Sequence, residues 1–321
     1  MFNWLGSHSA IVPFYHSTIE NLPNKSKIIS PSVVQMLWAI FFFAGMNLCV
    51  KGLHGMPSME IVFFRCAISI VITFWLLRRI EVPPMGRSDN RWRLWGRGLS
   101  GTTALFLFFL TVQKLPLATA VTIQYLSPIF TAILAMLFLK EKLMPVQWLF
   151  FGISFAGVAM LKGFDERVSW LYLGIGILSA FLAGVAYVFV RSMSGREHPL
   201  VIVFYFQLVG TMLGGSFTLA DFQMPAATGW MLLLGVGLLA HIAQVKLTKA
   251  IQGEKAGVIT SLNFLGAIYA SIFGWVLFNE AVTWSNVFAM TLVIAGVLLN
   301  IIANAGRGQR FVRFAANLFS N

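Results

Sequence analysis

The chain has 321 residues, of which 58% are hydrophobic and only 11% are charged. Soluble domains average roughly 45–50% apolar and about 25% charged residues, so a soluble fold is excluded and we expect an all-α protein embedded in the lipid bilayer. The formal net charge of +12 would suggest nucleic-acid binding in a soluble protein, but here the placement of the basic residues along the chain accounts for it, so no nucleic-acid partner is expected.

Residues 1–31 lack the charged and then apolar pattern of a cleaved signal peptide and are predicted to form a cytoplasmic tail. Apolar runs close to the ~20 residues needed to cross hydrocarbon then follow one another with short connectors. They predict ten transmembrane helices, at residues 32–51, 59–77, 94–113, 118–139, 145–162, 169–190, 198–217, 227–246, 257–278 and 284–303. Residues 304–321 are predicted to be a basic amphipathic cytoplasmic tail, with a flexible basic tail as the alternative.

The basic residues lie mostly on one side of these spans. With the N-terminus inside, eighteen Lys and Arg fall in inner segments and four in outer segments. The positive-inside rule then predicts a multi-pass protein with both termini cytoplasmic, expected in the inner membrane of a bacterial cell.

Arg65 is the one basic residue that this count leaves at membrane depth, within the span at 59–77. A cation there costs several kcal/mol unless it faces protein, water or an anionic partner. One interpretation is that Arg65 faces a cavity and attracts an anionic group of a substrate. The alternative is that its side chain extends to the membrane surface or binds the carbonyl end of a neighbouring helix.

The two halves of the chain resemble each other at a shift of 139 residues. The more informative matches are Gln113 with Gln252, Glu141 with Glu280, Gln124 with Asn263, and Ala156-Gly157-Val158 with Ala295-Gly296-Val297. Residues 32–162 and 163–303 are therefore predicted to be two repeats of five helices each. Because five is odd, the second copy must be inverted in the membrane, which is typical of transporters that alternate access around a central site. At a shift of 141 residues the counterpart of Arg65 is Phe206, so this charge belongs to one half.

The segment from Ala118 to Lys142 and its counterpart from Gly257 to Glu280 resemble the signature of the EamA family, in the drug/metabolite transporter superfamily. The resemblance covers about residues 32–303 and implies a ten-helix carrier. It is specific for the family but not for the substrate, since members carry amino acids, nucleotide-related compounds, organic acids and drugs. Phe63-Phe64-Arg65 and Arg97-Gly98 are also similar to members that take up S-adenosylmethionine and to an organic-anion branch.

Polar side chains at mid-membrane depth are candidates for substrate binding, because buried amides and hydroxyls in lipid need partners. Hydrogen bonding between helices is the alternative for about half of them. The candidate substrate-binding residues are Asn47, Arg65, Gln124, Tyr125, Ser127, Tyr187, Asn263 and Tyr269.

Five further residues are candidates for gating or structural roles. Pro128 frees a backbone carbonyl and is expected to bend the fourth span. Glu141 and Glu280 end the fourth and ninth spans, where each carboxylate either latches a gate or, as the simpler interpretation, caps the next helix. Glu60 lies at the start of the second span, and His241 is either a proton relay or a packed polar contact.

The sequence holds no HExxH, GxxxxGK[ST] or CxxC motif, so we expect no metal, no cofactor and no enzymatic activity. The predicted function is secondary transport of a small organic metabolite, such as an amino acid, an organic anion or a nucleoside-like compound. The alternatives are a membrane-embedded enzyme and a non-transporting membrane partner or sensor protein. Proton coupling, exchange with a second solute, direction and oligomeric state all stay open.

Overall fold

The computed structural model describes residues 30–140, 145–164, 168–220, 222–253, 259, 261–278 and 283–304, and within them it contains helices and no strand. The elements are α2 (Pro31–Gly52), α3 (Ser58–Arg79), η1 (Ser88–Asn90), α4 (Arg91–Lys114), α5 (Leu117–Gln124), α6 (Ser127–Leu139), α7 (Val146–Phe164), α8 (Trp170–Ser192), α9 (Pro199–Ala220), α10 (Ala227–Gly253), η2 (Ser261–Phe264), α12 (Leu265–Phe278) and α13 (Trp284–Asn304). The predicted tails lie outside the described residues, apart from their innermost ends.

Each of the ten predicted spans corresponds to one helix or to one interrupted helix, so the all-α membrane fold is confirmed. Among the described residues, six segments are long and apolar enough to cross a membrane: α2, α3, α5 together with α6, α8, α9 and α10. Proline begins α2 at Pro31 and α9 at Pro199, where the first helical N–H has no partner within the helix in any case.

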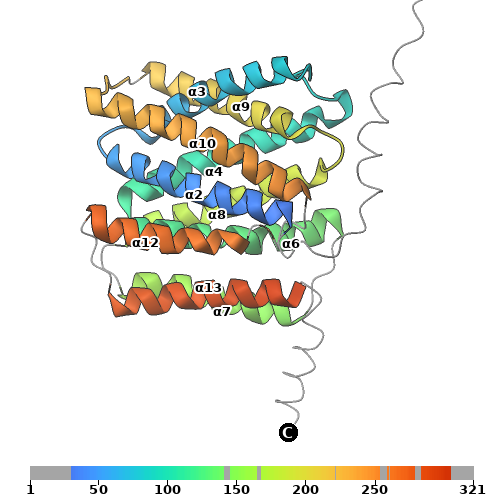
Figure 1. The fold of residues 1–321 in the computed structure, drawn as a ribbon. Coiled ribbons are helices and arrows are strands. Elements are labelled where there is room, and N and C mark those ends of the chain that lie inside the picture. Colours follow the sequence, from blue (N-terminus) through green and yellow to red (C-terminus); the bar gives the residue numbers. More distant parts are fainter. Residues whose placement is uncertain are drawn as a thin grey trace, which may run out of the picture. The chain divides into compact units, whose positions relative to one another are not determined.

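The two halves interlock across the repeat (Figure 1). Helix α2 packs along α10, and α4 packs along α8. We call two helices repeat mates when they occupy matching positions in the two halves. Helix α8 is the repeat mate of α2, and α10 is the repeat mate of α4. The contact of α2 with α10 and the contact of α4 with α8 are therefore equivalent. The mates α3 and α9 pack against each other, as do the mates α7 and α13. A two-fold exchange of the halves produces this pattern.

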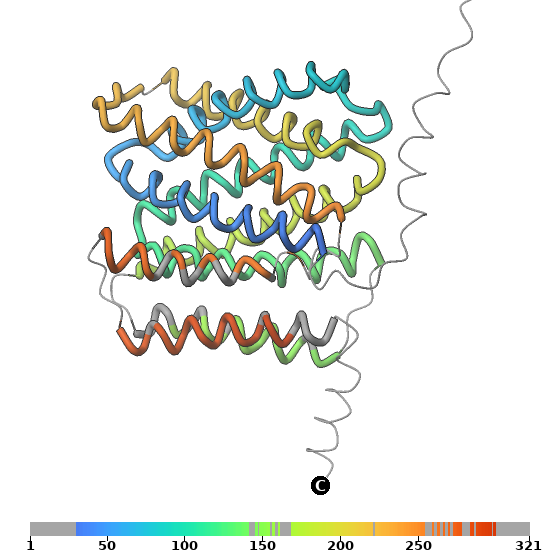
Figure 2. Tube along the Cα trace, viewed as in Figure 1, coloured from blue at the N-terminus to red at the C-terminus, as the bar shows by residue number. Residues whose placement is uncertain are grey.

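The chain trace shows the inversion directly (Figure 2). Helices α2 and α4 both end on the left of the view, whereas their mates α8 and α10 both end on the right. Repeat mates therefore run in opposite directions, as an odd number of spans in each repeat requires.

The pair α7 and α13 explains one of the informative repeat matches. A Cβ atom on Gly157 would lie 2.8 Å from the Ala289 carbonyl oxygen, and a Cβ atom on Gly296 would lie 2.6 Å from the Phe150 carbonyl oxygen. The glycine in each Ala-Gly-Val triplet thus lets its helix touch the backbone of the other. Ser154 Oγ also lies 3.3 Å from the Val293 carbonyl oxygen, across the same contact.

Two helices are interrupted near the middle of the bundle. The fourth span breaks between Gln124 and Ser127, where the N–H groups of Tyr125 and Leu126 donate to carbonyl oxygens three residues earlier, each at 3.1 Å. Pro128 then lies in the first turn of α6. The ninth span changes from η2 to α12 at the equivalent place, although it has Gly266-Ala267 where the fourth has Ser127-Pro128. The break therefore does not depend on proline.

The close contact at Gly157 can be tested by adding one methyl group. Gly157→Ala should lower the free energy of unfolding by about 1–3 kcal/mol, because the backbone of α13 must move away. Gly152, in the same helix, has open space where its Cβ would be, so Gly152→Ala should be neutral or slightly stabilising. Thermal unfolding in detergent would compare the two variants, and equal stabilities would contradict the packing described.

Candidate functional site

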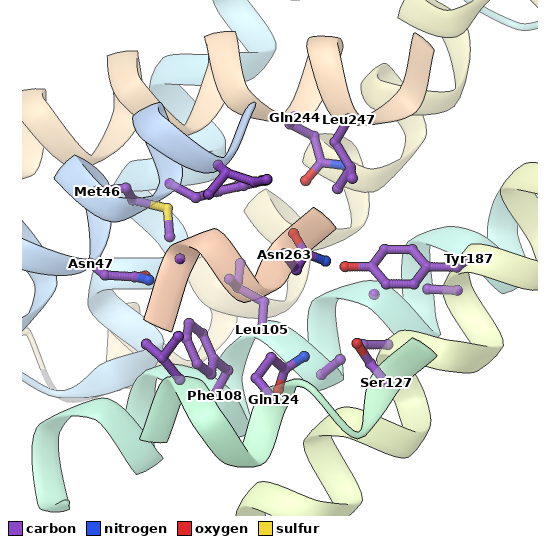
Figure 3. A pocket seen from close by; sticks show the side chains of 18 of the residues that line it. Met46, Asn47, Leu105, Phe108, Gln124, Ser127, Tyr187, Gln244, Leu247 and Asn263 are labelled. Carbon is purple, nitrogen blue, oxygen red and sulfur yellow. The ribbon is translucent and has the colours of Figure 1, made fainter. Parts of the chain in front are cut away.

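A cavity of about 160 Å³ lies between the interrupted helices and α2, α4, α8 and α10 (Figure 3). Apolar side chains form most of its wall. Among the described residues, the polar ones that line it are Asn47, Arg65, Arg97, Gln124, Tyr125, Ser127, Tyr187, Gln244 and Asn263. The described residues that line it include no Asp and no Glu.

Two buried arginines give the cavity its charge. Arg65 of α3 is 1% exposed and Arg97 of α4 is 3% exposed. Both guanidinium groups lie against the ring of Phe206, at 5.1 Å for Arg65 and 4.4 Å for Arg97 from the ring centroid. Phe206 is the repeat mate of Arg65, so the two positions meet where α3 packs against α9.

Neither arginine forms an ion pair with a described residue. Arg65 Nη1 lies 3.8 Å from the Cys66 sulfur, which is a weak acceptor. Arg65 Nε, Arg97 Nε and Arg97 Nη1 have no hydrogen-bond partner within the part of the chain that the structure describes. Both residues line the cavity, so buried guanidinium donors without a described partner lie next to it.

Arg97 corrects the charge count. The count places Arg97 with the cytoplasmic residues, because it stands close to the start of the predicted span. Helix α4 begins at Arg91, however, so Arg97 lies well inside it. Gly101, one turn further on, provides room for the guanidinium group, since a Cβ atom there would collide with Arg97 Nη1. An arginine followed four residues later by glycine is a sequence signal that could have identified it.

Seven of the eight predicted substrate-binding residues lie in the cavity wall, and Tyr269 does not. Figure 3 shows Gln124 and Ser127 pointing into the cavity from one side and Gln244 from the other, while the Tyr187 hydroxyl points toward Asn263. The Tyr269 ring instead packs edge-on against Phe41, with 6.2 Å between centroids.

Glu60 and His241 are not among the residues that line the cavity. Glu60 is 1% exposed, and its carboxylate accepts a hydrogen bond from the backbone N–H of Gln223 at 3.2 Å. His241 Nδ1 lies 3.4 Å from the Thr73 hydroxyl, at the contact of α10 with α3. This geometry is what a packed polar contact requires, and the role of His241 stays a prediction. Glu141 and Glu280 lie outside the described residues.

Comparison with known proteins identifies the family. Residues 30–162 and residues 170–302 each match the EamA-like transporter family. The chain belongs to this family. The two matches fall on the two five-helix halves, and this EamA-like transporter is a multi-pass membrane protein that transports a small metabolite.

Several relatives are similar along most of their length. The pseudopaline exporter CntI of Pseudomonas aeruginosa is 32% identical over 279 residues, which are 86% of this chain and 95% of that protein. Human solute carrier family 35 member G1 is 28% identical over 81% of this chain and 75% of its own. The riboflavin transporter of Rhizobium johnstonii is 25% identical over 91% of this chain and 99% of its own length. A crystal structure of a protein that is 17% identical in sequence has the same fold. The match has a TM-score of 0.65 and covers 84% of this chain and 96% of that protein.

The position of His241 leads to a prediction about pH. His241→Gln should leave the pH dependence of transport unchanged, because the imidazole contacts Thr73 and not the cavity. Transport by reconstituted protein would be measured across pH 5–8, the range in which an unperturbed histidine titrates. Loss of the pH dependence in this variant would instead identify His241 as a proton relay.

Proposed function

We propose that this transporter is a secondary carrier of a small organic anion. The substrate binds between Arg65 and Arg97 in the central cavity, which is exposed alternately to the two faces of the membrane. The observation that carries the proposal is the presence of two buried guanidinium groups at a cavity lined by no described carboxylate.

The electrostatic argument is direct. A buried charge without a partner costs several kcal/mol, and two cations at one cavity add their mutual repulsion. A carboxylate, phosphate or sulfonate accepts hydrogen bonds from guanidinium donors in paired geometry, so its binding removes this cost. A neutral substrate would leave both charges uncompensated.

The rest of the cavity wall suits the uncharged part of an organic molecule. Amide and hydroxyl groups of Asn47, Gln124, Tyr187 and Asn263 are placed to hydrogen-bond polar atoms, and apolar side chains cover hydrocarbon. Gln124 also contacts Ser179 Oγ at 3.2 Å, so part of its role is to join helices. The relatives that carry pseudopaline and riboflavin support an organic substrate.

A membrane-embedded enzyme is the alternative that composition and motifs leave open. It requires acid, base or metal-binding groups gathered at one place. Glu60 and His241 are the two candidates, and they have separate partners, Gln223 and Thr73. The carrier is the better proposal because substrate sites in transporters with inverted repeats lie near the interface of the repeats, where this polar cavity is found.

We also propose that both termini are cytoplasmic, in the inner membrane of a bacterial cell. If Arg97 is counted with the cavity, this orientation assigns seventeen basic residues of the sequence to inner segments and four to outer segments, as the positive-inside rule requires. Short epitope tags at either terminus should both be accessible in inverted vesicles and both be protected in intact spheroplasts. Opposite accessibility of the two tags would contradict the even number of spans.

The substrate class can be tested without knowing the substrate. Purified protein would be screened by thermal unfolding against carboxylates, phosphates and sulfonates and against their neutral amide or ester analogues. A ligand that binds only the folded state stabilises it by about 2.7 kcal/mol at about 100 times its dissociation constant. We expect hits among the anions, and hits confined to neutral compounds would overturn the proposal.

The arginine variants then test the site. Arg65→Ala and Arg97→Ala should each weaken anion binding and transport by about 100-fold, because a buried charge pair is broken. Without ligand, each variant should be at least as stable as the parent, since an uncompensated charge is removed. Arg79→Ala is the control, because Arg79 is exposed and lies over Trp75. Normal transport by both cavity variants would contradict the proposed site.

A further inference from the structure

A group of hydrogen bonds joins the ends of α2 and α4. The Gln113 side-chain N–H groups donate to the carbonyl oxygens of Leu53 at 3.0 Å and Met56 at 2.8 Å, and the Ser58 hydroxyl donates to the Gln113 side-chain oxygen. In the opposite direction, Lys51 Nζ donates to the carbonyl oxygens of Val112 and Leu115, at 3.2 and 2.7 Å. We call this group the Gln113 clasp.

A second group joins the ends of α8 and α10. The Gln252 side chain donates to the Glu197 carbonyl oxygen at 3.0 Å. The Gln252 carbonyl oxygen accepts from the Ser194 hydroxyl at 2.8 Å and from Arg191 Nη1 at 3.4 Å. The Glu197 carboxylate also accepts from the Arg87 backbone N–H at 2.8 Å. We call this group the Gln252 clasp.

The two clasps are the same device in the two repeats. Gln113 and Gln252 are matched residues, and each donates to a carbonyl oxygen in the connector between the first two helices of its own half. In each, a cation at the end of the first helix, Lys51 or Arg191, binds carbonyl oxygens at the end of the third helix. Such cations stabilise a helix C-terminus. The inversion places the clasps at opposite ends of the bundle (Figure 1).

Each clasp connects the two helix pairs that enclose the cavity. The cavity lies between the helix pair α2 and α10 and the helix pair α4 and α8. Within each pair the helices pack along their length, whereas α2 contacts α4, and α8 contacts α10, much less. The Gln113 clasp therefore links the two pairs at one end of the cavity, and the Gln252 clasp links them at the other.

We propose that the two clasps are the latches of alternating access, and that they open one at a time. Opening toward the end of α2 and α4 breaks the Gln113 clasp while the Gln252 clasp holds, and opening toward the other face does the reverse. Their donors and acceptors lie at helix ends, where water replaces a broken bond, so each latch opens reversibly. The proposal rests on the alternating access of the proposed function but not on an anionic substrate.

The test measures access to the cavity from each face. Ala183, in the cavity wall, is replaced by cysteine in a chain whose native Cys49 and Cys66 are replaced by alanine. A membrane-impermeant maleimide is then added to vesicles of either orientation. Gln113→Leu should raise the labelling rate about fivefold or more from the face where α2 and α4 end, with no rise from the other face. Gln252→Leu should do the same from the opposite face.

Gln223→Leu is the matched control, since it removes an exposed amide from a connector outside both clasps. It should leave labelling unchanged from both faces. A rise from the same face in both glutamine variants, or no change in either, would overturn the proposal.

Thermal unfolding of each variant separates loss of a latch from loss of the fold. If a leucine variant does not fold, Ser58→Ala and Ser194→Ala remove one hydrogen bond from each clasp and should give the same opposed pattern, at about twofold. Because labelling needs no substrate, its outcome is independent of the arginine variants. Opposed labelling together with normal transport by Arg65→Ala and Arg97→Ala would refute the anion site and retain the latches.

Discussion

Backbone hydrogen bonding in hydrocarbon constrains every part of this chain. No water is present in the bilayer core to satisfy an unpaired N–H or C=O group, so the chain crosses it as helices and interrupts them only where protein or a cavity supplies partners. Both interruptions, between α5 and α6 and between η2 and α12, lie at the cavity. At the helix ends the same requirement is met by side chains of neighbours. Lys51, for example, donates hydrogen bonds to carbonyl oxygens at the C-terminal end of α4.

The repeat gives a nearly symmetric scaffold, and the charges break that symmetry. Arg65 has Phe206 as its counterpart, and Arg97 has Val236. Both cations therefore come from the first half, while the second half supplies the aromatic ring on which they rest. Glycines at matched positions, Gly98 and Gly237, allow α4 to approach α9 and α10 to approach α3 in the same way. Symmetry thus governs packing, and its exceptions govern the chemistry of the cavity.

The spans and their inversion could be predicted from the sequence because they depend on the lengths of apolar runs and on the parity of their number. The depth of Arg97 could not be predicted, because Arg91, Arg93 and Arg97 form one basic cluster in the sequence. Only the position at which α4 begins decides which of them lies within the bundle. Tyr269 was expected at the cavity because it follows Asn263 in the same span. At about 100° per residue, however, six positions turn a side chain to a different face of the helix. The position of a residue in a span therefore predicts its depth in the membrane better than it predicts the side of the helix on which its side chain lies.

The dependence of each half on the other has a consequence for biosynthesis. Helices α3 and α4 are made and inserted before α9 exists, so Arg65 and Arg97 enter the bilayer without the ring of Phe206. At a translation rate of about 5–20 residues per second, the interval between Arg97 and Phe206 lasts roughly 5–20 s. During that time the first half exposes both charges and the glycine faces meant for its partner. The nascent chain must therefore be held in a polar or protein-lined environment until its second half arrives, a demand that the finished protein no longer makes.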